Sequence, residues 1–284
     1  PLVSVLDTYL TRADFRPTTI ISAALGTLFR GFWYAHTLFG FLSPRAPLSE
    51  WQRSALLSVA RRAPSLVVGL SRDVVEAEAQ LNALLKHIGN SVSVEAVRND
   101  LSTGIASQST RFSSLSPAHV VFLGAMWRLE TLRAQAGAFS PLFSYYDVPA
   151  FTQEAAGAEI IQSVGDTVRR DAYDQNRLPL ALIAHSKQVH AIFISAISAR
   201  VPSHQIEAGI YREIQDMLLQ TVAVQEVVRS AALRYLDNLL TSFPSLVCDL
   251  GVVTVMLELL TVLRHACLDE FTDEVSLLPR PAVG

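Results

Sequence analysis

The sequence predicts an all-α protein, and three observations support this fold class. Apolar residues recur at steps of three and four, as at Leu250, Val253 and Leu257, which is the period of an amphipathic helix. Strict alternation of apolar and polar residues over the length of a strand is nearly absent. Prolines fall mostly where helices would begin or just after they would end, and there the missing N–H group costs little.

Six helices are expected in the first half of the chain, each placed by its apolar period and its end signals. Ser49 is positioned to cap the third helix, with Gln52 three residues later as its capping-box partner. Ser116 and Pro117 are typical of a cap followed by proline in the first turn. The segment 89–116 is expected to be weakly ordered or loop-rich, because it is serine-rich and poorly periodic. The six expected ranges are 2–12, 18–41, 49–62, 72–88, 93–105 and 117–136.

Five further helices of similar length are expected in the second half, after an irregular segment at 139–149. Ser203, which follows Pro202, is positioned as an N-cap, and Pro244 separates the last two helices. The C-terminal tail, residues 275–284, resembles a linker. The five expected ranges are 150–175, 179–200, 204–220, 222–241 and 246–269.

The expected architecture is a stack of antiparallel helices of the HEAT or armadillo type. Each helix in the second half has one wide apolar face, which a single helix pair cannot hide but which stacked pairs can. No sharp consensus of the tetratricopeptide or ankyrin kind occurs. The prediction is therefore one α-solenoid segment over residues 1–284, with a compact helical bundle as the competing arrangement.

Composition and charge exclude several classes of protein. Half of the 284 residues are hydrophobic and only 17% are charged, which excludes an intrinsically disordered chain. The formal net charge of −3 leaves no basic field to neutralise a nucleic-acid backbone. Apolar stretches at 20–42, 178–201 and 246–263 each carry ionisable groups, so they are expected as helices buried inside a protein, with no transmembrane segment. The chain starts at Pro1 without a signal peptide, which favours a fragment of a longer protein.

Two further groups of residues are expected to serve the fold. Cys248 and Cys267 are too few for a disulfide framework, so a reducing compartment is expected, with both thiols as small buried hydrophobic groups. The aromatic-rich run 29–34 would be a partner anchor if it were exposed. We expect it to form a core helix instead.

No catalytic, cofactor-binding or metal-binding residue is predicted. Glycine loops that cradle phosphate and the Gly-x-Ser-x-Gly turn are both absent. The two lysines, Lys86 and Lys187, lie on helical sequence and cannot serve as the strand lysine of a kinase. His185 and His190 are five apart, whereas a zinc pair on one helix face needs a spacing of three or four.

The order of several short motifs between about residues 30 and 263 resembles the helical scaffold of type III alpha phosphatidylinositol 4-kinases, in a fungal version. Each motif is a few residues on a helix, and their order and spacing carry the resemblance; the stretch 67–115 shows little likeness. The motifs are Gly31-Phe32-Trp33-Tyr34, Gly40-Phe41-Leu42, Glu50-Trp51, Ala60-Arg61-Arg62-Ala63-Pro64-Ser65-Leu66, Trp127-Arg128-Leu129-Glu130-Thr131-Leu132-Arg133, Phe143-Ser144-Tyr145-Tyr146, Val228-Arg229 to Tyr235-Leu236, Phe243-Pro244-Ser245-Leu246 and Val255-Met256-Leu257-Glu258-Leu259-Leu260.

The resemblance implies a non-catalytic part of a lipid kinase. The whole enzyme of that family phosphorylates phosphatidylinositol at the 4-position at the plasma membrane, and its kinase domain, which uses ATP and magnesium, lies downstream of this region. The family's α-solenoid holds the kinase, docks a helical-repeat adaptor and a palmitoylated membrane-anchor subunit, and contributes to dimer assembly. The implied location is cytoplasmic and peripheral at the plasma membrane, through the partner subunits.

Two other interpretations stay open. The first is a free-standing armadillo-like adaptor or membrane-anchor scaffold protein in trafficking or signalling. The second is an all-α enzyme with a pocket between helices, for which the only support is the region of His185 and His190. A lipid-kinase domain in the same reading frame would favour the kinase scaffold over both.

Overall fold

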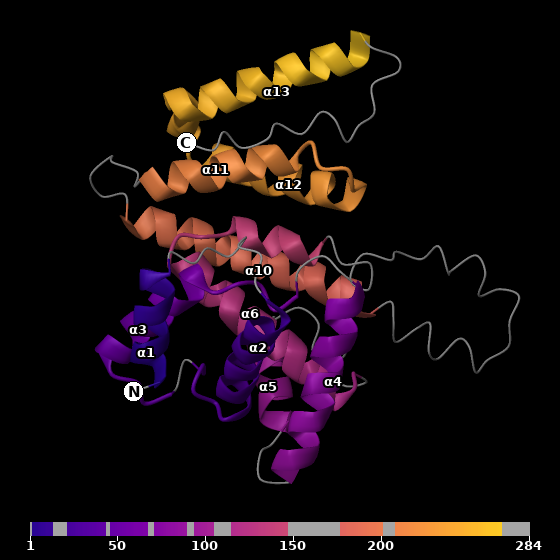
Figure 1. Ribbon diagram of the computed structural model, residues 1–284. Helices are drawn as coiled ribbons and strands as arrows, with labels where there is room; N and C mark the ends of the chain where they lie inside the picture. The colour runs from indigo at the N-terminus through magenta and orange to yellow at the C-terminus, as the bar shows by residue number, and fades with distance from the viewer. Residues whose placement is uncertain are drawn as a thin grey trace, which may run out of the picture. The chain divides into compact units, whose positions relative to one another are not determined.

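The computed structural model describes residues 2–13, 22–43, 46–67, 71–89, 94–104, 115–146, 177–200 and 208–268 (Figure 1). These residues form helices and turns, and no strand occurs among them. The prediction of an all-α protein is confirmed for this part of the chain. The expected helix at 150–175, the Ser203 cap and the tail at 275–284 lie outside the described residues.

Most of the described helices agree with the expected ranges to within a few residues. In chain order the elements are α1 (Leu2–Arg12), α2 (Ala23–Leu38), α3 (Glu50–Arg62), α4 (Ser71–Ile88), α5 (Val94–Gly104), α6 (Pro117–Gln135), the 3-10 helix η3 (Ser140–Tyr145), α10 (Arg177–Arg200), α11 (Ala208–Gln220), α12 (Glu226–Ser242), the 3-10 helix η5 (Pro244–Cys248) and α13 (Leu250–Leu268).

The helix starts follow local capping chemistry. Ser49 caps α3 as expected: its Oγ accepts from the Gln52 backbone N–H (3.3 Å), and the Gln52 side chain accepts from the Ser49 N–H (2.9 Å). Ser116 Oγ accepts from the His119 N–H (3.2 Å) at the start of α6, with Pro117 in the first turn. Both predicted caps are confirmed.

Two helices begin later than their apolar period suggests. Ser22 Oγ accepts from the Leu25 N–H, so α2 starts at Ala23 and not near residue 18. Asp249 Oδ1 accepts from the Val252 N–H (3.0 Å), which fixes the start of α13 at Leu250. The apolar residue Leu246 belongs instead to η5, because Pro244 starts a separate short helix.

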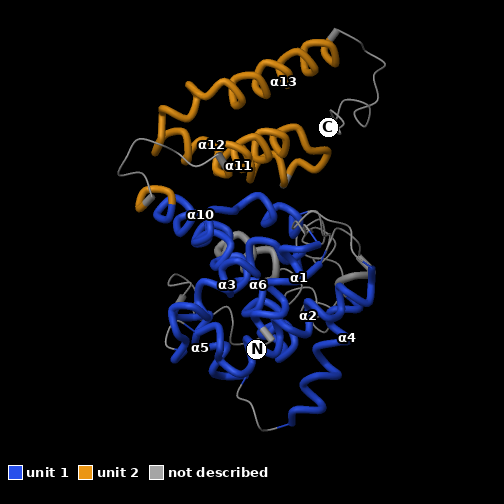
Figure 2. The backbone as a smooth tube through the Cα atoms, turned by 60° about the vertical axis from the view of Figure 1, so that its left-hand side comes forward, with its two compact units in different colours: residues 1–196 blue, residues 197–284 orange. Residues whose placement is uncertain are grey.

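The chain divides into two compact units, residues 1–196 and residues 197–284, which we call unit 1 and unit 2 (Figure 2). The boundary falls within α10. The expectation of one segment over 1–284 stays a prediction.

Unit 1 is organised around α6. This helix contacts α2, α3, α4 and α5, and fourteen of its nineteen residues are buried. Helices therefore cover α6 on several sides, and its buried residues are not confined to one face. Within unit 1, this packing around a central helix is closer to a bundle than to a linear stack.

An aromatic cluster extends the core of unit 1 beyond the end of α6. The Phe139 ring stacks on Phe193 of α10, with 5.5 Å between ring centroids, and meets Phe143 of η3 edge to face at 5.8 Å. His190 of α10 lies 5.1 Å from the same ring. The irregular join expected at 139–149 therefore begins as a buried 3-10 helix.

Unit 2 consists of consecutive helices in which α11 contacts both α12 and α13. Ile214, Met217 and Val228 belong to its core, whereas α13 exposes leucines along much of its length. The stretch Leu250–Cys267 is long and apolar enough to cross a membrane, and 11% of it is buried. The expectation that this stretch is a buried helix is therefore wrong for the described chain.

Candidate functional site

A buried ionic cluster joins three segments of unit 1 that are distant in sequence. At its centre, Arg133 of α6 is fully buried. Its Nε donates to the Ala60 carbonyl (2.9 Å), and its Nη2 donates to the Ala63 carbonyl. Its Nη1 pairs with Glu130, one turn earlier on the same helix. The end of α3 and the second half of α6 are thus held by one guanidinium group.

The position of Arg133 has a physical cause. The last carbonyls of a helix lack partners within the helix, and a buried carbonyl without a donor is costly. A guanidinium group supplies several donors in a planar fork and interacts favourably with the negative end of a helix dipole. Glu130 balances its charge, because an unpaired charge could not stay buried at this depth.

η3 completes the cluster through Tyr145, which is also buried. The Tyr145 hydroxyl donates to Glu130 Oε1 (3.2 Å) and accepts from the Leu66 backbone N–H (3.2 Å). Burial raises the pKa of Tyr145 well above its usual value, and the negative charge of Glu130 raises it further. Three of the motifs that resemble the kinase scaffold, those around residues 60–66, 127–133 and 143–146, therefore meet in one contact. The cluster uses its charged groups to hold segments together.

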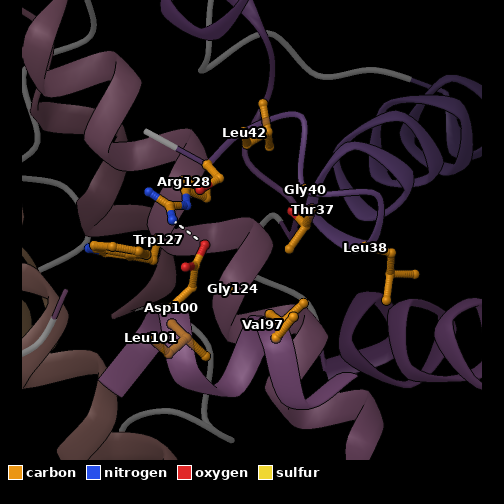
Figure 3. A pocket seen from close by; sticks show the side chains of 12 residues that line it. Thr37, Leu38, Gly40, Leu42, Val97, Asp100, Leu101, Gly124, Trp127 and Arg128 are labelled. Atoms are coloured by element: carbon orange, nitrogen blue, oxygen red, sulfur yellow. Dashed lines mark hydrogen bonds and ion pairs between the residues drawn. The ribbon is translucent and has the colours of Figure 1, made fainter. Parts of the chain in front are cut away.

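A second feature of unit 1 is an open pocket of about 160 Å³ between α2, α5 and α6 (Figure 3). Most of its walls are apolar, and two opposite charges lie among them. We call it the α2–α5–α6 pocket, and it is lined by Thr37, Leu38, Gly40, Leu42, Ser43, Ala96, Val97, Asp100, Leu101, Gly124, Trp127 and Arg128.

Arg128 and Asp100 form the charged pair of this pocket. Arg128 Nη2 lies 2.6 Å from Asp100 Oδ2, as the dashed line in Figure 3 shows, and the guanidinium carbon lies 4.3 Å from the centroid of the Trp127 ring. The Arg128 side chain is 9% exposed, whereas that of Asp100 is 46% exposed. Burial lowers the pKa of Arg128, and the hydrogen bond and charge of Asp100 oppose that shift. The acidic member of the pair is therefore the more exposed one.

Of the histidines and lysines considered from the sequence, the structure describes the side chains of His190, Lys187 and Lys86, which lie in different surroundings. His190 is buried against Phe139, Lys187 is exposed, and the side chain of His185 lies outside the described residues. Lys86 is exposed on α4. Among the described residues, no group of three histidine, cysteine, aspartate or glutamate side chains could hold a metal ion.

The aromatic-rich run of α2 is part of the core, as expected. Phe29, Trp33 and Tyr34 are buried. Arg30 is buried with them and donates from Nε to Gln80 Oε1 of α4 (3.1 Å). Burial raises the pKa of Tyr34, because the phenolate form would lose its hydration.

The expectation for the cysteines is wrong. Cys248 at the end of η5 and Cys267 in the last turn of α13 are both exposed. Cys248 follows Leu246 and Val247, and Cys267 lies on the apolar helix α13, so both neighbourhoods suggested burial. Whether each thiol is buried depends on which side of η5 or α13 packs on the rest of unit 2. The residues next to each cysteine in the sequence do not determine that side.

Sequence reasoning did not identify the α2–α5–α6 pocket. Its walls come from three helices, and Asp100 on the short helix α5 carries no motif that distinguishes it from a solvated aspartate. The one available signal was Arg128, an arginine between Trp127 and Leu129 on an otherwise apolar helix. An arginine in that position requires a partner when it is buried.

Comparisons with known proteins point to one class of enzyme. The chain is 22% identical over 241 residues to the phosphatidylinositol 4-kinase STT4 of Saccharomyces cerevisiae, which covers 85% of the chain and 12% of the kinase. It is 25% identical over 250 residues to the phosphatidylinositol 4-kinase stt4 of Schizosaccharomyces pombe, which covers 87% of the chain and 12% of that kinase. No protein-family model and no solved structure matches the chain.

The chain thus spans about one eighth of the length of the two curated relatives it matches. Nearly the whole chain takes part in each match, so the similarity concerns a region of the kinases as large as the chain itself. Over this region, the chain is similar to part of phosphatidylinositol 4-kinases.

Proposed function

We propose that this chain is a non-catalytic, solenoid-like scaffold segment of a phosphatidylinositol 4-kinase. The observation that carries the proposal is an alignment with part of two such kinases. It covers 85–87% of the chain, at 22–25% identity. In the proposed role, the segment supports a kinase domain located elsewhere in the parent protein. That domain, with ATP and magnesium, performs the phosphorylation of phosphatidylinositol.

The use of charged side chains in unit 1 supports a scaffold role. Arg133, Glu130 and Tyr145 bind parts of the same chain, and Arg30 binds α4. The Glu130 carboxylate and the Tyr145 hydroxyl, which are groups suited to acid–base chemistry, form hydrogen bonds that hold helices in place. A segment held together in this way is suited to keep a catalytic domain and its partners in a fixed arrangement.

The arrangement of unit 2 supports the solenoid-like part of the proposal. Here α11, α12 and α13 follow one another in sequence, and α11 contacts both of the other two. A terminal helix of a repeat stack normally has a polar outer face. α13 instead exposes apolar residues, among them Leu250, Leu257 and Leu260. An apolar outer face is typical of a helix that has protein on both sides.

The proposal extends to partners and location. A scaffold of this kind docks an adaptor subunit and a membrane-anchor subunit, and it reaches the plasma membrane from the cytoplasm through them. Dimer assembly of the parent complex through this segment is part of the same proposal. Exposed apolar side chains in unit 1 and unit 2 supply candidate contact surfaces.

The reading frame of the parent gene tests the assignment directly. We expect it to encode a lipid-kinase domain downstream of Gly284. A stop codon shortly after this point would contradict the proposal and favour a free-standing armadillo-like adaptor. Calorimetric titration of the 284-residue chain with ATP and magnesium gives an independent test. Tight nucleotide binding would show that the segment is not a simple scaffold.

A further inference from the structure

Two exposed phenylalanines, Phe39 and Phe41, follow the C-terminal end of α2, next in the chain to residues that line the α2–α5–α6 pocket. Leu38, Gly40 and Leu42 line the pocket, whereas the intervening residues Phe39 and Phe41 are 55% and 50% exposed. The centroids of these two rings lie 6.3 Å apart. Along residues 38–42, residues that line the pocket therefore alternate with exposed phenylalanines.

This alternation is fixed by the way α2 ends. Gly40 has a φ of 71°, its N–H donates to the Thr37 carbonyl (3.1 Å), and the Phe41 N–H donates to the His36 carbonyl (3.0 Å). These are the two hydrogen bonds of a Schellman motif, with glycine at its left-handed position. The His36 ring lies 5.8 Å from the Phe41 ring. The exposed rings thus sit on a defined turn, and their exposure is a property of the folded backbone.

The size of the pocket fits one side chain. The pocket is open to solvent and has a volume of about 160 Å³. A cavity of about 150 Å³ accommodates benzene, whereas pockets for drug-sized ligands and cofactors begin at roughly 300 Å³. The volume therefore matches an aromatic or large aliphatic side chain.

The charges at the pocket and on α5 indicate which type of partner residue should lie beside the inserted side chain. Nearly half of the Asp100 side chain is exposed, whereas the Arg128 side chain that pairs with it is buried. Glu95, also on α5, is exposed and is paired at 3.1 Å with the mostly buried Arg98. The charged ends that α5 presents to solvent in these two pairs are thus carboxylates, and they complement a lysine or arginine of a partner.

We propose that the α2–α5–α6 pocket, whose lining residues Gly40 and Leu42 share a turn with the exposed Phe39 and Phe41, docks a protein segment that inserts one large apolar side chain and places a basic residue beside Asp100. Interfaces of this type gain most of their affinity from a few anchors that fill pockets, surrounded by contacts that exclude water. The inference deepens the proposed scaffold role and holds whether or not the parent protein is a kinase.

The test uses synthetic peptides and the full 284-residue chain. The probe is a fluorescent twelve-residue peptide with a central tryptophan flanked by lysines in an alanine-serine background. Matched peptides replace the tryptophan with alanine or the lysines with glutamates. Binding is measured by fluorescence anisotropy at two salt concentrations. We expect the tryptophan–lysine peptide to bind, and the alanine peptide to lose affinity by about 30-fold, as is typical for the loss of a central anchor.

Two substitutions on α5 locate the binding. Ala96 lines the pocket and is exposed, so Ala96→Trp should block the entrance and weaken peptide binding at least tenfold. Asn99 is exposed on the same helix and does not line the pocket, so Asn99→Trp is the matched control and should leave binding unchanged. Asp100→Asn keeps an acceptor for Arg128 but removes the carboxylate, so it should abolish the preference for lysine over glutamate.

Several results would overturn the inference. Equal affinity of the tryptophan and alanine peptides would show that no anchor enters the pocket. Unchanged binding by the Ala96→Trp variant, or no binding by any peptide, would show that the pocket is not a docking site. Binding of phosphatidylcholine–phosphatidylserine vesicles that depends on Phe39 but not on Ala96 would show that the rings meet a membrane instead. None of these results bears on the reading frame of the parent gene, so the pocket and the kinase assignment can fail separately.

Discussion

The Arg133 guanidinium donates a hydrogen bond to the carbonyl of Ala60, a residue 73 positions earlier in the chain. The contact joins the centre of unit 1 to the end of α3, and Glu130 and Tyr145 complete it. Its members are buried and hydrogen-bonded to one another, so each depends on the others. Substitutions in this cluster are therefore expected to destabilise unit 1.

Arg133→Met should destabilise unit 1 by about 3–5 kcal/mol, because it leaves Glu130 charged and buried without its partner. The measurement is urea unfolding followed by circular dichroism. The double variant Arg133→Met with Glu130→Gln removes both charges and should recover part of the loss. A single variant within 0.5 kcal/mol of the parent chain, on the order expected of a surface substitution, would show that the cluster does not stabilise the fold.

Tyr145→Phe should cost about 1–3 kcal/mol, since the Leu66 N–H loses its acceptor and Glu130 loses a donor in a buried site. Tyr9→Phe is the matched control, because the side chain of Tyr9 is exposed on α1. Both variants can be compared by thermal unfolding in the same buffer. Equal effects of the two changes would contradict the buried hydrogen bonds described for Tyr145.

Gly124→Ala should destabilise unit 1 by about 1–3 kcal/mol through overpacking. A Cβ atom at position 124 would lie 2.6 Å from Val97 Cγ1 and 3.2 Å from Thr37 Cγ2, so α6 could not keep its approach to α5 and α2. Val97→Ala in the same chain removes the closest atom and should restore part of the stability. If Gly124→Ala stabilised the chain, the gain in helix propensity would outweigh the steric clash, contrary to this expectation.

Two neighbouring leucines of α13 should differ strongly in how much their replacement by glutamine changes stability. Leu259 is 5% exposed, so Leu259→Gln should destabilise unit 2 by about 2–5 kcal/mol, in the range of large core losses. Leu260 is 60% exposed, so Leu260→Gln should change stability by less than about 0.5 kcal/mol and should reduce self-association. Urea unfolding and light scattering measure the two effects. A reversed order of the two variants would mean that α13 packs through its other face.

His36 should make stability depend on pH. Burial lowers its pKa below the usual value of 6.5, although a hydrogen bond with the Phe32 carbonyl opposes the shift. The folded chain therefore takes up this proton at a lower pH than the unfolded chain. Stability contributed by neutral His36 is present above pH 6.5 and is lost as the pH falls through the folded-state pKa. The slope of the unfolding free energy against pH, measured from pH 7.5 to 5, should flatten in the His36→Gln variant, and an unchanged slope would contradict this role.

The fold class and many helix ends could be predicted because they depend on local chemistry. The cap formed by Ser49 and Gln52 involves residues three apart, and the sequence alone contains everything that specifies it. The start of α13 was harder, because the apolar period continues back to Leu246 while Asp249 supplies the actual cap. The capping residue Asp249 therefore determines the start of α13, although the apolar pattern extends further back.

The sites were less predictable because they depend on contacts between distant segments. The individual motifs around residues 60–66, 127–133 and 143–146 could be identified, but their meeting at Arg133 requires the packing of α3 on α6. The α2–α5–α6 pocket likewise combines Leu42, Asp100 and Arg128, which share no pattern in the sequence. The exposure of Cys248 and Cys267 follows the same rule, because burial is decided by neighbours in space.

The long reach of Arg133 also sets an order of events during synthesis. The carbonyls of Ala60 and Ala63 leave the ribosome well before their donor, and at about 5–20 residues per second the delay is several seconds. Until α6 emerges, the end of α3 must keep its hydrogen bonds with water. A nascent chain that stalls before residue 133 therefore carries an open α3 terminus, which chaperones and proteases can recognise.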